Sequence, residues 1–407
     1  MNLSSAVSRR ALIRSLFFAI LAFITIFAAG HRYGLVPPFG PLLSPGRGVW
    51  HRVKPIYEKS SEASTLSLDA LKESVEVVVD DDQIKHVFAK NDHDLYVAQG
   101  YLLASERLWE MDFLARTASG RLSEILGERT LEIDKYFRRM GLAAAAQGSA
   151  EEFERDPLTR AAVSAYAEGV NAYISQLDRK NLPLEYRLLG HEPEPWSLVK
   201  TAQLLKFMAW NLAGGSRDLQ LSRSVAQLSG SEIDELFPLN IEPPEPIIPR
   251  GTKWNFTSSA PPAPLARFQP DLSRFKPVPT PDPGNGSNNW AVSGRKSTTG
   301  LPILSNDIHL SLYLPSLWYE MQLVSPTQNV YGIALPGAPG VVLGFNSKLA
   351  WGVTNAGVDV LDWYQLRFRD ETKSEYLFNG QWRPVIAREE TIKVRGAADV
   401  TLVQRQT

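Results

Sequence analysis

If the chain were cut immediately before Ser287, this serine would become an N-terminal residue that carries a hydroxyl group. It follows a proline-rich segment, because residues 243–283 contain twelve of the chain's 28 prolines. That composition favours extended, solvated backbone and cannot sustain helix or sheet. A serine hydroxyl is a weak nucleophile until a base takes its proton, and a free α-amine titrates at about 7.7–8.0, close to working pH. If the preceding bond breaks, Ser287 therefore supplies a nucleophile and a base on one residue.

Gly286 precedes the serine and, having no Cβ, leaves room for the peptide between them to twist. We expect the Ser287 hydroxyl to attack the Gly286 carbonyl in an N-to-O acyl shift that breaks this bond. Taken alone, the pentapeptide Gly286–Trp290 also fits an ordinary domain boundary, since Gly-Ser pairs often end linkers. The chain's six histidines form no obvious conventional triad elsewhere.

Strands predominate after the serine, and helices predominate before the proline-rich segment. The strands expected from the pattern cover residues 290–294, 301–305, 318–322, 329–333, 349–353 and 363–367. In the first part, strands are expected at 75–79 and 85–88, and helices from Asp92, from Asp156-Pro157 to about Leu177, after Ser197, and near Phe237 with Ser231 and Asp234 as a cap. We therefore expect a mainly helical region followed by a strand-rich region that begins at the serine.

Composition excludes several classes of site. The 407 residues carry a formal net charge of −1 with no basic patch, so nothing in the sequence indicates a nucleic-acid partner. The chain has no cysteine, which excludes disulfides, a thiolate nucleophile and cysteine-ligated zinc. A hydrophobic content of 44% over this length is ordinary for a globular protein with a large core.

The N-terminus has the pattern of an export signal. Arg9, Arg10 and Arg14 precede the apolar run Leu16–Ala29, which has signal-peptide length and is shorter than the about 20 residues of a spanning helix. We expect an exported protein. It is either periplasmic after removal of residues 1–30, or anchored by them to the cytoplasmic membrane and facing the periplasm.

Two groups of motifs lie on either side of the proline-rich segment. The first group comprises Asp94–Tyr101, Glu106–Met111 and Arg116–Gly127. The second group comprises Ser287–Trp290, Asn306–His309, Leu335–Val341 and Leu349–Asn355. In this order and at this spacing, they resemble the starts of the α and β subunits of the penicillin acylase (penicillin amidase) family of N-terminal nucleophile hydrolases. The resemblance covers the chain from about Val75 to Thr407 and implies an autoproteolytic zymogen whose α and β chains form a heterodimer.

The resemblance also implies an α+β fold, the αββα sandwich of N-terminal nucleophile hydrolases, with two antiparallel sheets between helices. The expected divisions are a signal peptide or anchor (1–30), a linker (31–74), a mainly helical α-subunit region (75–242), a proline-rich spacer peptide (243–286) and the start of the β subunit (287–407). Compared with the family, the sequence stops within the β subunit, so the sandwich is expected to be incomplete.

His309 and Asn355 are the catalytic candidates beside Ser287. By itself, His309 fits an ordinary loop histidine, 22 residues after the serine. Family members similar to acyl-homoserine lactone and cephalosporin acylases have histidine there, where penicillin G acylases have glutamine. That implies a histidine that holds a bridging water or adjusts the pKa of the α-amine. At Asn355 the family uses a backbone N–H as one oxyanion-hole donor, and its other donor, an asparagine, lies beyond Thr407.

Asp359 and Asp362, three residues apart, suit a hard cation such as Ca²⁺ but are also typical of a solvated loop. The family's calcium site uses two aspartates and a carbonyl at this spacing, which implies Asp359, the Leu361 carbonyl and Asp362 as ligands. Asp218 stands where the family has a glutamate ligand. The implied Ca²⁺ is structural and joins the two chains without touching the substrate. No organic cofactor is expected.

Met208, Leu212 and Trp318 match family positions near the substrate and are the candidates for an acyl pocket. A Met or Leu stripe on a helix is also typical of plain core. The sequence therefore predicts that the acyl pocket is apolar, but it does not predict how deep the pocket is.

These features predict a hydrolase of non-peptide C–N bonds that cleaves penicillin-type acyl amides, which are small linear carboxylic acid amides, through an acyl-enzyme on Ser287. Two alternatives stay open. An acyl-homoserine lactone acylase would use the same machinery with a longer apolar pocket. A catalytically dead fragment, or a secreted binding protein, would be expected if the chain ends at Thr407. The reading frame beyond that codon distinguishes these classes.

Overall fold

The chain folds into two compact units in a computed structural model that describes residues 9–31, 64–178, 181–216, 218–237, 251–253, 279–282, 284–312, 314–356 and 360–407. The first unit combines Met1–Met208, Gly286–Thr354 and Arg388–Gln404, and the second combines Ala209–Asn285, Asn355–Ala387 and Arg405–Thr407. Each unit contains helices and strands, which agrees with the α+β class. Most of the predicted linker and of the proline-rich spacer lies outside the described residues.

The helices of the first unit begin and end at local sequence signals. They are α1 (Arg9–Gly30), α3 (Asp92–Ser119), α4 (Ser123–Leu126), α5 (Leu131–Arg139), α6 (Leu142–Arg155), α7 (Pro157–Ser175), α8 (Leu184–Leu189) and most of α9 (Leu198–Ala213). The Asp156 side chain accepts a hydrogen bond of 2.8 Å from Thr159 N, and Pro157 occupies the first position of α7. The predicted start of this helix is therefore confirmed.

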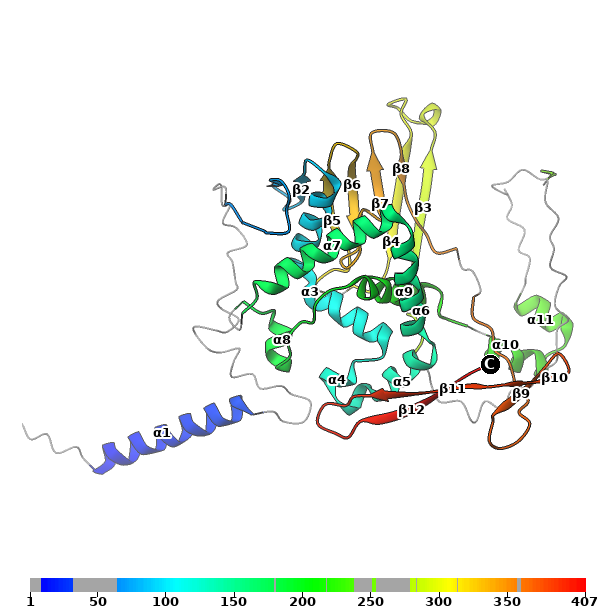
Figure 1. Ribbon diagram of the computed structural model, residues 1–407, viewed down its shortest axis with the longest axis horizontal. Coiled ribbons are helices and arrows are strands. Elements are labelled where there is room, and N and C mark those ends of the chain that lie inside the picture. The colour runs from blue at the N-terminus through cyan, green and yellow to red at the C-terminus, as the bar shows by residue number, and fades with distance from the viewer. Residues whose placement is uncertain are drawn as a thin grey trace, which may run out of the picture. The chain divides into compact units, whose positions relative to one another are not determined.

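Helices α3 and α7 pack so closely that glycine is required on both (Figure 1). An added Cβ on Gly100 would lie 2.1 Å from the Tyr166 carbonyl oxygen, and one on Gly169 would lie 1.9 Å from that of Val97. Either contact would force the two backbones apart. The pair of glycines thus sets the distance between the helices that support the sheet.

A six-stranded sheet joins segments from both sides of the proline-rich spacer. Its order is β1 (Glu76–Val79), β2 (Lys85–Phe88), β5 (Tyr319–Val324), β6 (Asn329–Ala334), β7 (Leu343–Asn346) and β8 (Ala350–Trp351). β2 runs parallel to β5, with Val87 opposite Leu323, and the other pairs are antiparallel. Val87, Met321 and Leu323 are fully buried against α3, and burying one such side chain contributes about 1.5–3 kcal/mol. The segments before and after the proline-rich stretch therefore share one core.

Side chains from both helices hold the glycine-rich motif Leu335–Val341 between β6 and β7. Gly340 N donates to Gln99 Oε1 at 2.8 Å, and Gln99 Nε2 donates to the Gly340 carbonyl at 2.9 Å. Gly337 N donates to the Tyr166 hydroxyl at 2.8 Å. In this structure, the motif connects the sheet to α3 and α7.

The remaining strands form hairpins. β3 (Gly286–Val292) pairs antiparallel with β4 (Ile303–His309), and β11 (Ile386–Ile392) pairs with β12 (Val400–Gln406), largely within the first unit. The second unit contains α10 (Asp218–Gln227), α11 (Gly230–Leu236) and the hairpin of β9 (Glu375–Phe378) and β10 (Gln381–Pro384).

Three predicted elements differ from the structure. The strand expected from Trp290 begins at Gly286, so the bond expected to break lies inside β3. The strand expected at 363–367 does not form, because Tyr364 is 79% exposed and pairing with β9 begins only at Arg367 and Phe368. α11 is capped by Ser229, not Ser231, because Glu232 completes a capping box with Ser229.

A buried ionic network lies where α3, α4 and α9 meet. The Arg116 guanidinium is 1% exposed and contacts Asp112 at 3.0 Å, Glu124 at 3.2 Å and Glu194 at 3.1 Å. Lys200 adds an ion pair of 3.2 Å to Asp112. Burial favours a raised pKa for Glu194, but the hydrogen bonds and positive charges around it outweigh burial and lower its pKa to about 2.

Candidate active site

Ser287 lies at the start of β3, with its hydroxyl against the bond that is expected to break. In the ladder, Ser287 faces Ile308 of β4, and Gly286 faces His309. The Ser287 hydroxyl donates a hydrogen bond of 2.5 Å to the Gly286 carbonyl oxygen. The serine is half-buried. The hydroxyl and the carbonyl expected to react in the N-to-O acyl shift are therefore in contact in the folded chain.

Gly286 is not required by packing at this position. A Cβ added to it would meet no atom within 4 Å. The steric argument for glycine that the sequence suggested is therefore not supported by the folded, uncut chain. Any need for Gly286 must come from the twisted geometry of the cleavage step.

The segment that precedes Asn355 lies beside Ser287. The Thr354 hydroxyl donates a hydrogen bond of 2.9 Å to the Ser287 carbonyl oxygen. Asn355 follows directly in sequence and begins a segment of the second unit, in which its side chain donates to the Leu212 carbonyl. The Asn355 side chain is thus occupied by a backbone partner.

Asn306 of β4 connects this segment to the nucleophile strand, a role that the sequence analysis missed. Its amide nitrogen donates to the carbonyls of Asn288 at 3.1 Å and Val353 at 3.0 Å, and its amide oxygen accepts from Val353 N at 2.7 Å. A Cβ on Gly352 would lie 2.7 Å from the same amide oxygen. Asn306 belongs to the Asn306–His309 motif, so the motif itself was the available signal.

His309 ends β4, and its side chain turns to a neighbour on its own strand. Its Nε2 atom lies 2.8 Å from Asp307 Oδ2, and the histidine side chain is 46% exposed. The structure therefore brings the His309 backbone to Gly286 while its imidazole pairs with Asp307. Because side chains alternate along a strand, His309 and Asp307 project from the opposite face of the hairpin to Ile308 and Ser287, so contact between the imidazole and the serine would require the end of β4 to rearrange.

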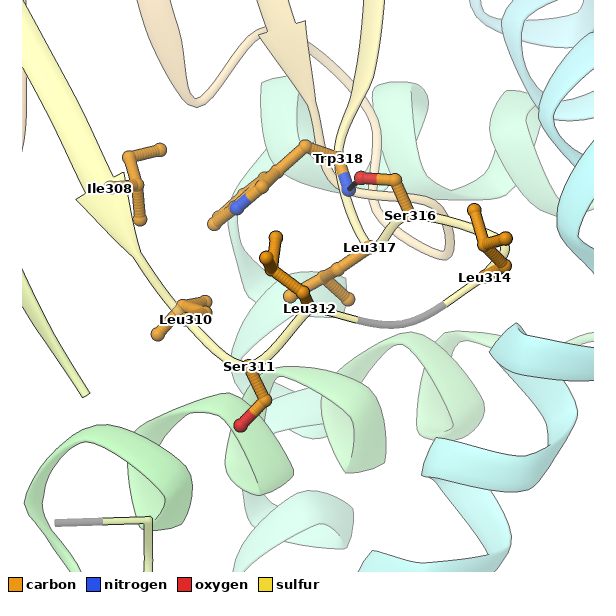
Figure 2. Close-up of a pocket in the computed structure, with 8 residues that line it drawn as sticks. All are labelled: Ile308, Leu310, Ser311, Leu312, Leu314, Ser316, Leu317 and Trp318. Atoms are coloured by element: carbon orange, nitrogen blue, oxygen red, sulfur yellow. Dashed lines mark hydrogen bonds between the residues drawn. The ribbon is translucent and has the colours of Figure 1, made fainter. Parts of the chain in front are cut away.

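An apolar cavity of about 380 Å³ opens beside the nucleophile strand. It is lined by Ile308, Leu310, Ser311, Leu312, Leu314, Ser316, Leu317 and Trp318. Figure 2 shows the Trp318 ring reaching toward Ile308, the residue that pairs with Ser287, with the leucines below it. The predicted pocket residue Trp318 is therefore part of a cavity that begins next to the serine.

The other two predicted pocket residues lie elsewhere. Met208 is 7% exposed and packs in the main core, which agrees with the plain-core alternative. Leu212 is 38% exposed and belongs to the second unit. Neither residue lines the cavity. Sequence reasoning instead missed Leu310 and Leu317, which follow the Asn306–His309 motif as ordinary apolar loop residues.

The predicted calcium ligands are partly described. Asp359 lies outside the described residues. Asp218 is the first residue of α10, and its N–H donates to Ser216 Oγ at 3.2 Å, whereas Asp362 is exposed and Leu361 is half-buried. Among the residues that the structure places, no group of three or more histidine or acidic side chains could hold a metal ion. A complete ligand set therefore depends on Asp359 and on main-chain oxygens.

The N-terminal helix α1 is longer than its apolar run suggested. The 18 residues Ile13–Gly30 have a mean hydropathy of 2.1, so the helix is long and apolar enough to cross a membrane. A signal sequence near the N-terminus has the same properties. The length and composition of α1 thus fit both a signal peptide that is removed and a membrane anchor that is kept.

Known proteins resemble most of this chain. A family model described as penicillin amidase matches residues 74–407. The acyl-homoserine lactone acylase QuiP of Pseudomonas aeruginosa is 34% identical over 326 residues, which cover 77% of this chain and 37% of that protein. Penicillin acylase 2 proenzyme of Pseudomonas sp. strain SE83 is 30% identical over 351 residues, covering 83% of this chain and 43% of that protein.

The chain spans less than half the length of these relatives. A solved structure, a thermostable penicillin G acylase from Alcaligenes faecalis, aligns with 44% of this chain and 98% of that chain at 25% identity, with a TM-score of 0.38 that is too low to establish a shared fold. The family match itself extends over both motif groups and the sheet that joins them. The chain therefore belongs to the penicillin amidase family.

Proposed function

We propose that this chain belongs to an amidohydrolase precursor that cuts itself before Ser287 and then hydrolyses acyl amides through an acyl-enzyme on that serine. The observation that carries the proposal is the 2.5 Å hydrogen bond from the Ser287 hydroxyl to the Gly286 carbonyl, and the ladder partner of Ser287, Ile308, lines an apolar cavity. Mass spectrometry of the protein expressed from its full reading frame tests it, because a β chain beginning at Ser287 is expected.

In this proposal the freed α-amine of Ser287 takes the proton of its own hydroxyl, directly or through water. His309 would hold that water or adjust the pKa of the amine after turning away from Asp307. The backbone N–H of Asn355 would donate to the oxyanion of the tetrahedral intermediate, and such donors contribute about 3–4 kcal/mol each. The hydrogen bonds of Asn306 and Thr354 support this role because they hold the preceding residues beside Ser287.

Two further features belong to the proposal. The α and β chains would remain together as a heterodimer, which the sheet shared by β2 and β5 supports, since cutting at Ser287 leaves that ladder intact. The complete protein would form the αββα sandwich. The six-stranded sheet and the separate β3–β4 hairpin would contribute to its two sheets.

The substrate class follows from the cavity, whose lining is apolar apart from two serine hydroxyls and the Trp318 indole. It suits aromatic or medium-chain acyl groups, including those of penicillin-type amides. Acyl-homoserine lactones are the second candidate, because relatives named for that activity match the chain as well as those named penicillin acylases do.

A ladder of acyl amides is expected to show a preference for apolar acyl groups. Each added methylene that the cavity buries contributes about 0.8 kcal/mol, so kcat/KM should rise several-fold per CH₂ until the cavity is full. Octanoyl and phenylacetyl amides should be hydrolysed faster than the charged glutaryl amide. A preference for the glutaryl amide would contradict the assignment of the cavity as the acyl pocket.

We also propose a structural Ca²⁺ held by Asp359, Asp362 and the Leu361 carbonyl with Asp218. Hard oxygen donors from separated segments support this assignment. If Ca²⁺ binds the folded protein alone, it raises stability by RT ln(1 + [Ca²⁺]/Kd). The melting temperature should therefore fall with chelator and recover with excess calcium, and Asp359→Asn should remove the difference while leaving acyl preference unchanged. Identical melting curves with and without chelator would exclude the site.

Export to the periplasm, with α1 either removed or kept as an anchor, is proposed from the apolar helix behind three arginines. The mass of the mature α chain distinguishes removal of residues 1–30 from retention.

A further inference from the structure

Glu110 on α3 is a buried carboxyl group without a hydrogen-bond partner. Its side chain is 10% exposed, and neither carboxyl oxygen is hydrogen-bonded. The nearest cation is Arg107, whose Nε lies 3.8 Å from Glu110 Oε2, which is too long for a hydrogen bond. Burial raises the pKa of Glu110 to about 7, although the charge of Arg107 opposes that rise. This carboxyl group therefore changes charge near neutral pH.

Arg107 is also the residue that ties α3 to the wall of the cavity. Its Nε donates a hydrogen bond of 3.0 Å to the Ser316 carbonyl, and its guanidinium lies 5.3 Å from the centre of the Tyr319 ring. Ser316, Leu317 and Trp318 line the cavity. One arginine thus contacts both the unpartnered carboxyl group and the backbone of the pocket wall.

The other charged groups beside the Tyr319 ring, Lys85 and Glu106, are already paired. Lys85 of β2 forms an ion pair of 2.8 Å with Glu106 and also donates to the Tyr319 hydroxyl. Arg107 is the one charged group that affects the pKa of Glu110. If Glu110 ionises, Arg107 is therefore the donor that it can recruit.

We propose that Arg107 positions the wall of the acyl pocket and that the charge of Glu110 controls this contact, so that acyl-group affinity depends on pH. While Glu110 is neutral, Arg107 donates to Ser316. Once Glu110 is ionised, leaving its buried carboxylate without a donor costs more free energy than losing the hydrogen bond from Arg107 to the Ser316 carbonyl. The Arg107 guanidinium therefore turns to Glu110. The wall then loses its anchor. The inference rests on the proposed function because it treats this cavity as the acyl pocket.

Steady-state kinetics on an octanoyl amide, from about pH 6 to about pH 8.5, test the proposal. In the wild type, KM should rise about three- to tenfold as the pH passes the pKa of Glu110, the effect of one lost hydrogen bond. In Glu110→Gln, KM should stay low across the range, and Arg107→Lys should have a raised KM throughout. The pH profile of kcat, which reports the nucleophile, should be the same in all. Glu106→Gln, the same change one turn earlier on α3 at a side chain that is 43% exposed, should keep the wild-type profile.

Hydrogen exchange gives a readout that does not need activity. At pH 8, the amides of residues 316–318 should exchange faster in the wild type than in Glu110→Gln at the same pH, and at pH 6 the two should agree. If no variant hydrolyses the amide, the proposed function fails while this comparison still decides the inference. Equal exchange at both pH values, or a KM profile in Glu110→Gln that follows the wild type, would overturn it.

Discussion

Replacing Ser287 with alanine is expected to leave the precursor as one chain and to abolish amide hydrolysis. In the proposed mechanism, the hydroxyl that contacts the Gly286 carbonyl would act in the cutting step and, after cutting, would form the acyl-enzyme. Loss of a catalytic nucleophile typically lowers kcat by roughly 10⁴–10⁶-fold. Intact mass measurement follows the cut, and an acyl amide assay follows turnover. Ser287→Cys should be cut slowly and hydrolyse amides poorly, since thiolate attack and amide turnover make different demands.

Ser305→Ala is the matched control for this experiment. Ser305 is a half-buried serine of the same hairpin and lies opposite Trp290, three residues along β3 from Ser287. It should be processed and should turn over substrate like the wild type. Normal cutting in Ser287→Ala, or a mature β chain that starts at another residue, would refute the mechanism.

Replacing Arg116 with alanine is expected to lower the free energy of unfolding by about 3–5 kcal/mol, because it removes the buried guanidinium that contacts three carboxylates and leaves the buried Asp112 with Lys200 as its remaining ion-pair partner. Arg116 is 1% exposed and contacts Asp112, Glu124 and Glu194. Urea unfolding at neutral pH measures the change. Arg155→Ala is the control, since Arg155 forms an exposed ion pair with Glu152 on α6, with 70% of the Arg155 side chain exposed. That exposed pair should contribute less than about 1 kcal/mol.

The pH dependence of the same network has a defined sign. The pKa of Glu194 is lowered from 4.5 to about 2, so the stability that it contributes is present above pH 4.5 and is lost as the pH falls toward 2. The wild type should therefore lose stability over this acid range more steeply than Arg116→Ala. In the urea experiment at neutral pH, an equal loss of unfolding free energy in Arg116→Ala and Arg155→Ala would show that the network does not stabilise the fold.

Local signals in the sequence predicted the elements whose ends depend on neighbouring residues. Asp156-Pro157 marked the start of α7, and Lys85–Phe88 marked β2, because caps, proline and β-branched patterns act within a few residues. The same reasoning failed at 363–367, where aromatic residues in a strand-like pattern remain outside any ladder and pairing with β9 begins only at Arg367 and Phe368. A strand needs a neighbour, and no local pattern supplies one.

By itself, the sequence determined the type of chemistry that we propose at Ser287, since its hydroxyl, its latent α-amine and the absence of cysteine are properties of the residues. Only the tertiary structure decided which groups meet there. It placed β2 beside β5 across the proline-rich spacer, and it gave Asn306 its three bonds to Asn288 and Val353. It also buried Glu110 beside an arginine that holds the pocket wall. Some of these contacts join residues that are far apart in the chain, so no local pattern predicts them. The others depend on burial, which is set by all the groups that pack around a side chain and therefore has no local signature in the sequence.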